Sequence, residues 1–403
     1  MYDQIKTLAR SRSDDLVKFL RELIAIPSVS GHETKVIERI RHEMEMLDYD
    51  TIWVDPFGNL FGQMGSGKRL LAMDGHCDTV DVGNPDNWTV PPFGGDLRNG
   101  TVYGRGAADQ KGGLASAVYA GKILKDMGIP EDVSLLVVAS VCEEDFEGLC
   151  WQYIVEKDNI QPEAVLLTEP TNLGIRIGQR GRLEMKVTIR GISCHGSAPE
   201  RGENAIYKAA PIIQDIEELN RRLSSRSILG KGSVTITDIR STAPSLCAVA
   251  DRATLHLDRR LTEGETMESA VAEICNLKSV TSAEAEVTVP EYEVVSYTGV
   301  KVPVTAYYPM WLMEKSHPLV RSAVHAHESL FQKKAAVGAW IFSTNGVATN
   351  GLFDIPTVGF GPGEERYAHT PEDQVKTGDL VKAAAFYVAF ILEWSNFKRI
   401  SLT

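Results

Sequence analysis

A histidine and a carboxylate follow an apolar stretch in the run Leu70-Leu71-Ala72-Met73-Asp74-Gly75-His76-Cys77-Asp78. A histidine that binds a metal usually donates its second ring N–H to a carboxylate, which fixes the tautomer and raises the basicity of the ligand nitrogen. The spacing of His76 and Asp78 directly after a strand therefore suits a metal site. Alone it is equally typical of a polar loop, so the interpretation depends on further ligands at comparable places.

Three other predicted strands are also followed by residues that can bind a metal. Glu143 and Glu144 follow the strand 133–141, Glu169 follows the strand 164–167, and His369 comes after the strand 357–360 and its Gly-Pro-Gly loop. In open α/β sheets the ligand crevice lies at the carboxyl ends of the strands. Four strand ends would therefore deliver histidines and glutamates to one edge of the sheet.

The acidic run Glu143-Glu144-Asp145 would on its own be read as a solvated turn. Neighbours on an extended segment point in opposite directions. Within the set of strand ends, one of the two glutamates can bind a metal while the other faces the reacting water.

Asp109 is a further candidate ligand, in the glycine-rich run 104–113 that opens a predicted helix. The Gly-x-Gly of this run resembles a dinucleotide-binding fingerprint. It lacks the third glycine and follows no long buried strand, which argues against a dinucleotide site.

Five motifs together resemble a known family. They are Gly75-His76-Cys77-Asp78, Gly106-Ala107-Ala108-Asp109-Gln110-Lys111-Gly112-Gly113, Glu143-Glu144, Thr168-Glu169-Pro170 and His369-Thr370-Pro371. In this order, from about residue 15 to the end, the chain resembles the two-zinc metallopeptidase family of acetylornithine deacetylase, succinyl-diaminopimelate desuccinylase, aminoacylase and glutamate carboxypeptidase. The stretches 150–153, 193–202 and 342–346 further resemble its selenium-metabolism-linked hydrolase subgroup, whose substrate is poorly defined.

The resemblance implies a role for each residue of the site. Asp109 would bridge two metals, with His76 and Glu169 completing one and Glu144 and His369 the other. Asp78 would orient His76, and Glu143 would be the general base. The resemblance also implies a cis peptide bond between Asp109 and Gln110.

Imidazoles and carboxylates without thiolates suit zinc in an open catalytic site, and cobalt or manganese could replace it. Two such metals about 3.5 to 4 Å apart would lower the pKa of a shared water and polarise the scissile carbonyl. The expected cofactors are therefore two divalent metal ions, with zinc as the first choice.

Three residues outside the metal set are candidate substrate groups. Arg259 shares a strand face with Leu255 and Leu257, where its charge needs an anionic partner. This partner is either an acidic side chain of the protein, in a structural ion pair, or, as the resemblance implies, the carboxylate of the substrate. His195 reads alone as a surface loop histidine, but the resemblance implies that it reaches a neighbouring subunit's site and stabilises the oxyanion. Asn345 is a weaker candidate for substrate contact.

The elements that must position these residues alternate between strands and helices. Helices are expected at 13–24, 33–47, 111–127, 319–331 and 377–394, and strands at 51–54, 60–64, 70–73, 133–141, 164–167 and 357–360. This pattern predicts an α/β fold with a mainly parallel sheet and helices on both faces. Between them, residues 181–293 have the order βαββαβ of a ferredoxin-like unit. We therefore expect a catalytic domain of residues 1–180 and 294–403 with an inserted domain, residues 181–293, that serves as lid and dimerisation surface.

Composition limits the partners of this chain. Its 403 residues carry 54 acidic and 42 basic side chains, and the net charge of −12 argues against nucleic acid or an anionic membrane surface. The sequence shows neither a secretory signal nor a span of about 20 apolar residues, so we expect a cytoplasmic protein. Six scattered cysteines without a Cys-x-x-Cys pair indicate neither a disulfide framework nor a thiolate zinc site.

The leading hypothesis is a metal-dependent hydrolase that cleaves the amide bond of a small N-acyl or N-carbamoyl amino acid. A carboxypeptidase or dipeptidase acting on short peptides is the alternative. Two other functional classes are further alternatives. One is a non-catalytic binding protein of the same fold, and the other is an amidohydrolase with Cys77 or Cys142 as its nucleophile. The complete set of ligands together with Glu143 argues against both.

Overall fold

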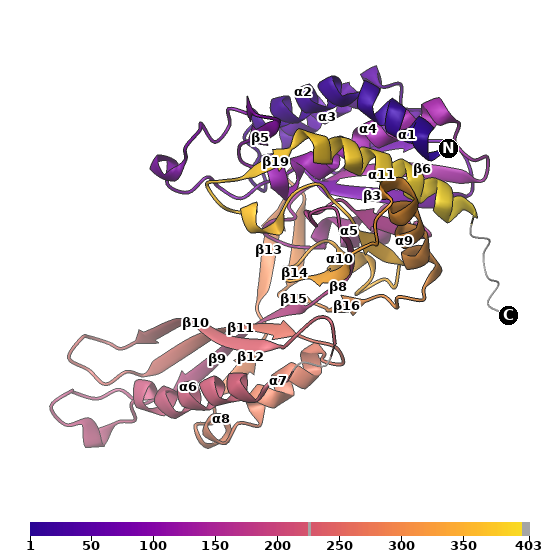
Figure 1. Cartoon of the computed structure of the whole chain (residues 1–403). Helices are drawn as coiled ribbons and strands as arrows, with labels where there is room; N and C mark the ends of the chain where they lie inside the picture. Colours follow the sequence, from indigo (N-terminus) through magenta and orange to yellow (C-terminus); the bar gives the residue numbers. More distant parts are fainter. Residues whose placement is uncertain (225–226, 397–403) are drawn as a thin grey trace.

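The computed structural model describes residues 1–224 and 227–396, and it shows a large α/β layer from which a smaller unit projects (Figure 1). The large layer is built on a nine-stranded sheet of order β1-β2-β6-β3-β7-β18-β8-β16, with β17 paired to β8. These strands are β1 (Thr51–Val54), β2 (Leu60–Met64), β3 (Arg69–His76), β6 (Val133–Ser140), β7 (Ala164–Leu167), β8 (Ile175–Gln179), β16 (Trp311–Leu312), β17 (Val337–Trp340) and β18 (Thr357–Gly359).

The sheet is parallel in its centre and largely antiparallel on its flanks. Strands β6, β3, β7 and β18 are parallel neighbours, whereas β1 and β2 on one side and β16 on the other pair antiparallel. The predicted α/β class is confirmed. The sheet as a whole is mixed, and the predicted parallel character holds for the strands that carry the candidate ligands.

Helices cover both faces of this sheet, as the residues at the end of β3 show. A Cβ on Gly75 would lie 2.9 Å from Leu114 Cβ in α4, whereas the preceding Asp74 accepts a hydrogen bond from Asn345, which lies just before α10. Neighbouring residues of a strand face opposite sides, so α4 and α10 lie on opposite faces. The helices of the layer are α1 (Tyr2–Ser11), α2 (Ser13–Ile24), α3 (Thr34–Met46), α4 (Gly112–Met127), α5 (Leu149–Glu156), α9 (Pro318–Phe331), α10 (Gly346–Thr349) and α11 (Thr377–Asn396).

The projecting unit has the predicted βαββαβ order with one additional short helix. Its elements are β9 (Gly181–Arg190), α6 (Ala205–Arg222), β10 (Ser233–Thr242), β11 (Arg252–Leu261), α7 (Met267–Cys275), α8 (Lys278–Ser282) and β12 (Glu286–Thr288). The sheet order is β10-β11-β9-β12, and β15 (Tyr307–Tyr308) also pairs with β9. Leu183, Met185, Leu255 and Leu257 are buried on the face that the helices cover.

Each unit has its own hydrophobic core. The buried residues that form the core of the projecting unit lie between Leu183 and Val280. The chain returns to the larger core at Val294. The hairpin of β13 (Glu291–Val295) and β14 (Lys301–Thr305) joins the two. These cores support a division into residues 1–180 with 294–403 and an inserted unit of residues 181–293, which we retain as a proposal.

A small sheet of order β19-β5-β4 ties two functional loops together. Its strands β4 (Asp96–Arg98) and β5 (Thr101–Tyr103) precede Asp109, and β19 (Gln374–Lys376) follows His369. Across residues 1–224 and 227–396, none of the helices has the length and apolar character needed to cross a membrane. The cytoplasmic location stays a prediction.

Candidate metal centre

The candidate ligands lie at neighbouring strand ends on the carboxyl edge of the parallel centre. His76 is the last residue of β3, Glu143 and Glu144 follow β6, and Glu169 follows β7. The predicted strand ended at Met73, but β3 continues to His76 because its ladder with β6 extends to the pair of His76 and Ser140. This pairing holds the backbone of the histidine in a regular strand.

The Asp109 carboxylate lies between two histidines. Its Oδ1 is 3.2 Å from His76 Nε2, and its Oδ2 is 3.3 Å from His369 Nε2. His369 Nε2 also lies 2.8 Å from Glu144 Oε2. Because each carboxylate oxygen of Asp109 faces a different histidine, this residue is placed to serve two cations at once.

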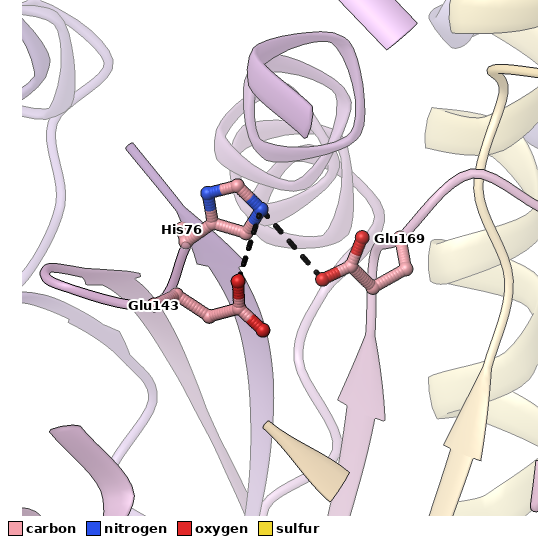
Figure 2. A group of neighbouring side chains, drawn as sticks. All are labelled: His76, Glu143 and Glu169. Atoms are coloured by element: carbon pink, nitrogen blue, oxygen red, sulfur yellow. Dashed lines mark ion pairs between the residues drawn. The ribbon is translucent and has the colours of Figure 1, made fainter. Parts of the chain in front are cut away.

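A second group of side chains surrounds His76. Figure 2 shows Glu143 and Glu169 converging on the His76 ring, with Glu143 Oε2 and Glu169 Oε1 each 3.7 Å from Nε2. All three side chains are buried. Both glutamates are equally close to the histidine, so their assignment as base and ligand stays a prediction.

Asp78 supports both His76 and the glutamate turn. His76 Nδ1 lies 3.0 Å from the backbone oxygen of Asp78 and 3.5 Å from its carboxylate. Asp78 Oδ2 accepts hydrogen bonds from Ser30 Oγ at 2.7 Å and from the Glu144 N–H at 3.0 Å. Asp78 therefore fixes the orientation of the histidine ring and the position of the Glu144 backbone.

The electrostatics of the site call for cations. Burial raises the pKa of Glu143 well above its ordinary value, and although His76 counteracts this, Glu169 adds to it. Burial and the Asp109 charge likewise raise the pKa of Glu169. Within the described residues, Glu143 Oε1 and Glu169 Oε2 are buried without a hydrogen-bond donor, which is costly unless a cation satisfies them. Imidazole and carboxylate donors with unsatisfied oxygens fit a zinc-type metal.

The loop that carries Asp109 is held by a residue that the sequence analysis missed. Asp373 accepts hydrogen bonds from the Gly106 N–H at 2.7 Å, the Ala108 N–H at 2.8 Å and Arg105 Nη1 at 3.1 Å. The only sequence signal for it was its place four residues after His369. The peptide bond between Asp109 and Gln110 is cis, as the resemblance implied.

A cavity of about 680 Å³ opens over these ligands, a size typical of small-molecule sites. Its floor contains Asp109, Glu143, Glu144, Glu169 and His369. The remaining wall is lined by Glu147, Arg182, Arg260, Ile341, Phe342, Ser343, Glu365, Arg366 and Ala368. Four of the five predicted metal ligands therefore line the cavity, and the fifth, His76, lies behind them in contact with Asp109.

A model of peptidase family M20/M25/M40 matches residues 72–393, a range that contains every one of these ligands. The chain belongs to this family. The M20 family assignment confirms the resemblance and makes the protein a hydrolase of the metallopeptidase class.

Individual M20 relatives cover nearly the whole chain. "Uncharacterized protein YgeY" of Escherichia coli (strain K12) is 48% identical over 96% of both chains. "Probable succinyl-diaminopimelate desuccinylase" of Staphylococcus epidermidis is 24% identical over 90% of this chain and 93% of the relative.

Solved structures share the M20 fold. Aminopeptidase PepT from Bacillus cereus has a TM-score of 0.75 at 21% identity and covers 95% of this chain and 99% of its own. The Bacillus subtilis protein YXEP, described as a dinuclear metal binding peptidase of the M20 family, has a TM-score of 0.71 at 14% identity, covering 95% of this chain and 98% of its own.

Arg259 does not point into the cavity of this M20 enzyme, contrary to the expected role in substrate binding. Its Nη2 contacts Glu265 Oε1 at 2.8 Å and Glu273 Oε2 at 3.2 Å, and the side chain is buried. It faces the helix side of the β11 strand with Leu257, whereas the next residue, Arg260, lines the cavity. The structural ion pair, the other reading of the sequence, is the one observed.

Asn345 also lies away from the cavity wall. Its Nδ2 donates to Asp74 Oδ2 at 2.9 Å and Ser140 Oγ at 3.2 Å, while its Oδ1 accepts from the Gly148 N–H at 2.9 Å. The expectation of substrate contact is wrong because all its polar atoms are used within the fold. Instead it ties together the strands that end in His76 and precede Glu143.

His195 is exposed on a loop of the inserted unit, where its Nδ1 lies 2.7 Å from Ser197 Oγ. It does not line the cavity of its own chain. Its predicted role in a neighbouring subunit stays a prediction.

The cysteine-nucleophile alternative finds no support in the site. Cys77 and Cys142 are both buried, and burial raises the pKa of each thiol. A reactive cysteine needs the opposite, a lowered pKa and an accessible sulfur.

Proposed function

We propose that this M20 enzyme hydrolyses the amide bond of a small N-acyl or N-carbamoyl amino acid, with Glu143 as the general base. The observation that carries the proposal is the Glu143 carboxylate, which lines the cavity beside His76 and has one oxygen without a partner. The desuccinylase name of the Staphylococcus epidermidis relative supports a deacylase. A carboxypeptidase or dipeptidase remains the alternative, because a cavity of about 680 Å³ also admits a short peptide.

The cations of the proposed site would be two divalent metals, with zinc favoured over cobalt or manganese. His76, Asp109 and Glu169 would hold one, and Asp109, Glu144 and His369 the other. Bound there, they would polarise the scissile carbonyl and acidify water.

Glu143 accepts a proton from the attacking water and delivers it to the leaving nitrogen, so that water adds across the C–N bond. A carboxylate that lines the cavity beside the proposed metal ligands is placed for both steps. His195 of a second subunit would donate a hydrogen bond to the carbonyl oxygen as it gains charge.

Removal of metal tests the proposed function. Dialysis against a chelator should abolish hydrolysis, and zinc should restore it. The substrates are a panel of N-acetyl, N-succinyl and N-carbamoyl amino acids together with dipeptides. Full activity in a metal-free preparation would contradict the mechanism, and turnover of dipeptides alone would select the peptidase alternative.

Arg260 is the residue we assign to the carboxylate of the amino acid. It lines the cavity and its guanidinium is held by Asp258 at 2.8 Å and 3.1 Å. We expect Arg260→Met to raise KM about 100-fold, since a hydrogen bond between charged groups contributes roughly 1.5 to 3 kcal/mol. Arg259→Met is the matched control on the opposite strand face. It should lower thermal stability and leave KM unaltered, and the reverse result would restore the assignment to Arg259.

The protein is proposed to be a homodimer formed through the inserted unit. Strand β10 is an edge strand of that unit, and Ile239 on β10 and Leu246 after it are exposed. The His195 loop lies beside this segment, since His195 forms an isolated bridge with Ala248. Exposed apolar residues on an edge strand favour pairing with a second chain.

Sedimentation analysis tests the dimer. We expect a dimer for the wild type, and a monomer with reduced turnover for Ile239→Asp, because His195 would then reach no neighbouring site. Met46→Asp changes an exposed apolar residue of α3 and serves as the control that stays dimeric. A wild type that sediments as a monomer at full activity would refute the proposal.

A further inference from the structure

Two arginines of the inserted unit face the cavity side by side. Arg182 on β9 and Arg260 on β11 are direct cross-strand partners, and both line the cavity above the candidate metal ligands. Their strand neighbours Leu183 and Arg259 are buried on the helix side. Like charges that stand directly opposite each other destabilise a sheet, so this pair needs a compensating partner.

The protein supplies each arginine with a close carboxylate partner. Arg260 is held by Asp258 of its own strand, whereas Arg182 Nη2 contacts Glu147 Oε2 at 2.7 Å and lies 3.9 Å from Glu184 Oε1. Glu147 does not belong to the inserted unit but to the loop after β6 that also carries Glu143. The arginine pair therefore faces the reacting centre from across the cavity.

Arg182 keeps unused capacity to bind an anion. Its guanidinium stacks on the Tyr308 ring at 4.3 Å, which fixes its plane. Its Nε is buried without a hydrogen-bond acceptor. A planar guanidinium held in place at the cavity wall is suited to a carboxylate.

We infer that the substrate of this site is a dianion, in which Arg260 binds the carboxylate of the amino acid and Arg182 binds a second carboxylate. This inference rests on the proposed deacylase function and narrows its substrate class. The second carboxylate belongs either to a dicarboxylic acyl group or to the side chain of the amino acid. Glu147 holds Arg182 in place and competes with the substrate for it.

Pairs of isosteric substrates test the inference. N-succinyl-L-alanine is compared with N-butyryl-L-alanine, and N-acetyl-L-glutamate with N-acetyl-L-glutamine. We expect the dianion of at least one pair to have a kcat/KM about 100-fold higher than its isostere, because one charge-assisted contact is added. The pair that shows the preference identifies which end of the substrate carries the second carboxylate.

Variants of the Arg182–Glu147 ion pair then test whether Arg182 causes the preference for the dianion. Glu147→Gln removes the competing carboxylate and should increase the dianion preference about tenfold, whereas the double variant Arg182→Gln/Glu147→Gln should bring the ratio close to one. The double variant is used because Arg182→Gln alone would leave the half-buried Glu147 without its close cationic partner. Arg12→Gln/Asp126→Asn neutralises a remote ion pair and should keep the wild-type ratio.

Binding measurements separate this inference from the proposed function. Calorimetric titration of the four compounds into the Glu143→Ala variant reports affinity without turnover. Tighter binding of a dianion supports the inference even if the wild type hydrolyses none of them, in which case only the deacylase proposal fails. Equal affinities within both pairs, or a preference that survives in the double variant, would overturn it.

Discussion

Replacing Glu143 with alanine is expected to lower kcat by about 10³-fold or more while the metal content stays as in the wild type. General-base catalysis contributes roughly 10² to 10⁴ to a rate, and we expect a loss at the upper end because Glu143 serves both proton transfers in the proposed mechanism. The side chain is buried at the cavity floor and both Glu143 and Glu169 approach His76 Nε2 at 3.7 Å. Elemental analysis of the purified variant together with its kcat checks the prediction.

The neighbouring glutamate provides the matched control. Glu144 Oε2 lies 2.8 Å from His369 Nε2, and its backbone N–H is held by Asp78. Glu144→Ala should therefore lose metal and activity together. If Glu143→Ala loses metal while Glu144→Ala retains it, the roles of the two residues are exchanged.

The proximity of the candidate ligands could be predicted from sequence because strand ends carry a strong signal. Apolar runs locate the parallel strands, and β6, β3, β7 and β18 are neighbours in the sheet. Residues that follow these strands must therefore meet at one edge. This rule gathered His76, Glu143, Glu144, Glu169 and His369 as candidates, and the family resemblance then implied which of them would bind metal.

The substrate side of the cavity could not be predicted in the same way. Arg259 and Arg260 differ by one position, and a shift of one residue moves a strand side chain to the opposite face. The sequence analysis assigned substrate binding to Arg259, on the strand face of Leu257, but the cavity lies on the opposite face. Glu147 and Asp373 were missed because their roles depend on partners more than 30 residues away, Arg182 and Gly106, which no local pattern reveals.

Asn345 shows a related limit. Its polar side chain near the site suggested contact with the substrate, yet it hydrogen-bonds Asp74 and Ser140 behind the ligand strands. Only the three-dimensional packing of α10 against those strands decides which side of the sheet the amide faces. A polar residue near a site can thus serve the geometry of the ligands without touching the substrate.

Asp109→Ala is expected to release both metals, whereas His369→Ala should release one. The two oxygens of Asp109 face His76 and His369 at 3.2 Å and 3.3 Å, so this carboxylate is common to both halves of the site. His369 contacts Glu144, which belongs to one half, and the shared Asp109. Titration of the metal-free variants with zinc should therefore give no tight site for Asp109→Ala, one for His369→Ala and two for the wild type.

The stoichiometry distinguishes a shared carboxylate from two independent sites. If Asp109 served one cation only, its removal would leave one tight site and the titration would resemble that of His369→Ala. Arg105 and the Ala108 N–H bind Asp373 rather than Asp109, so the loop keeps its supports when the Asp109 carboxylate is removed. If Asp109→Ala folds normally but binds no metal, the Asp109 carboxylate is required by both cations. The ligands at the four strand ends would then form a single two-metal site that depends on this shared carboxylate.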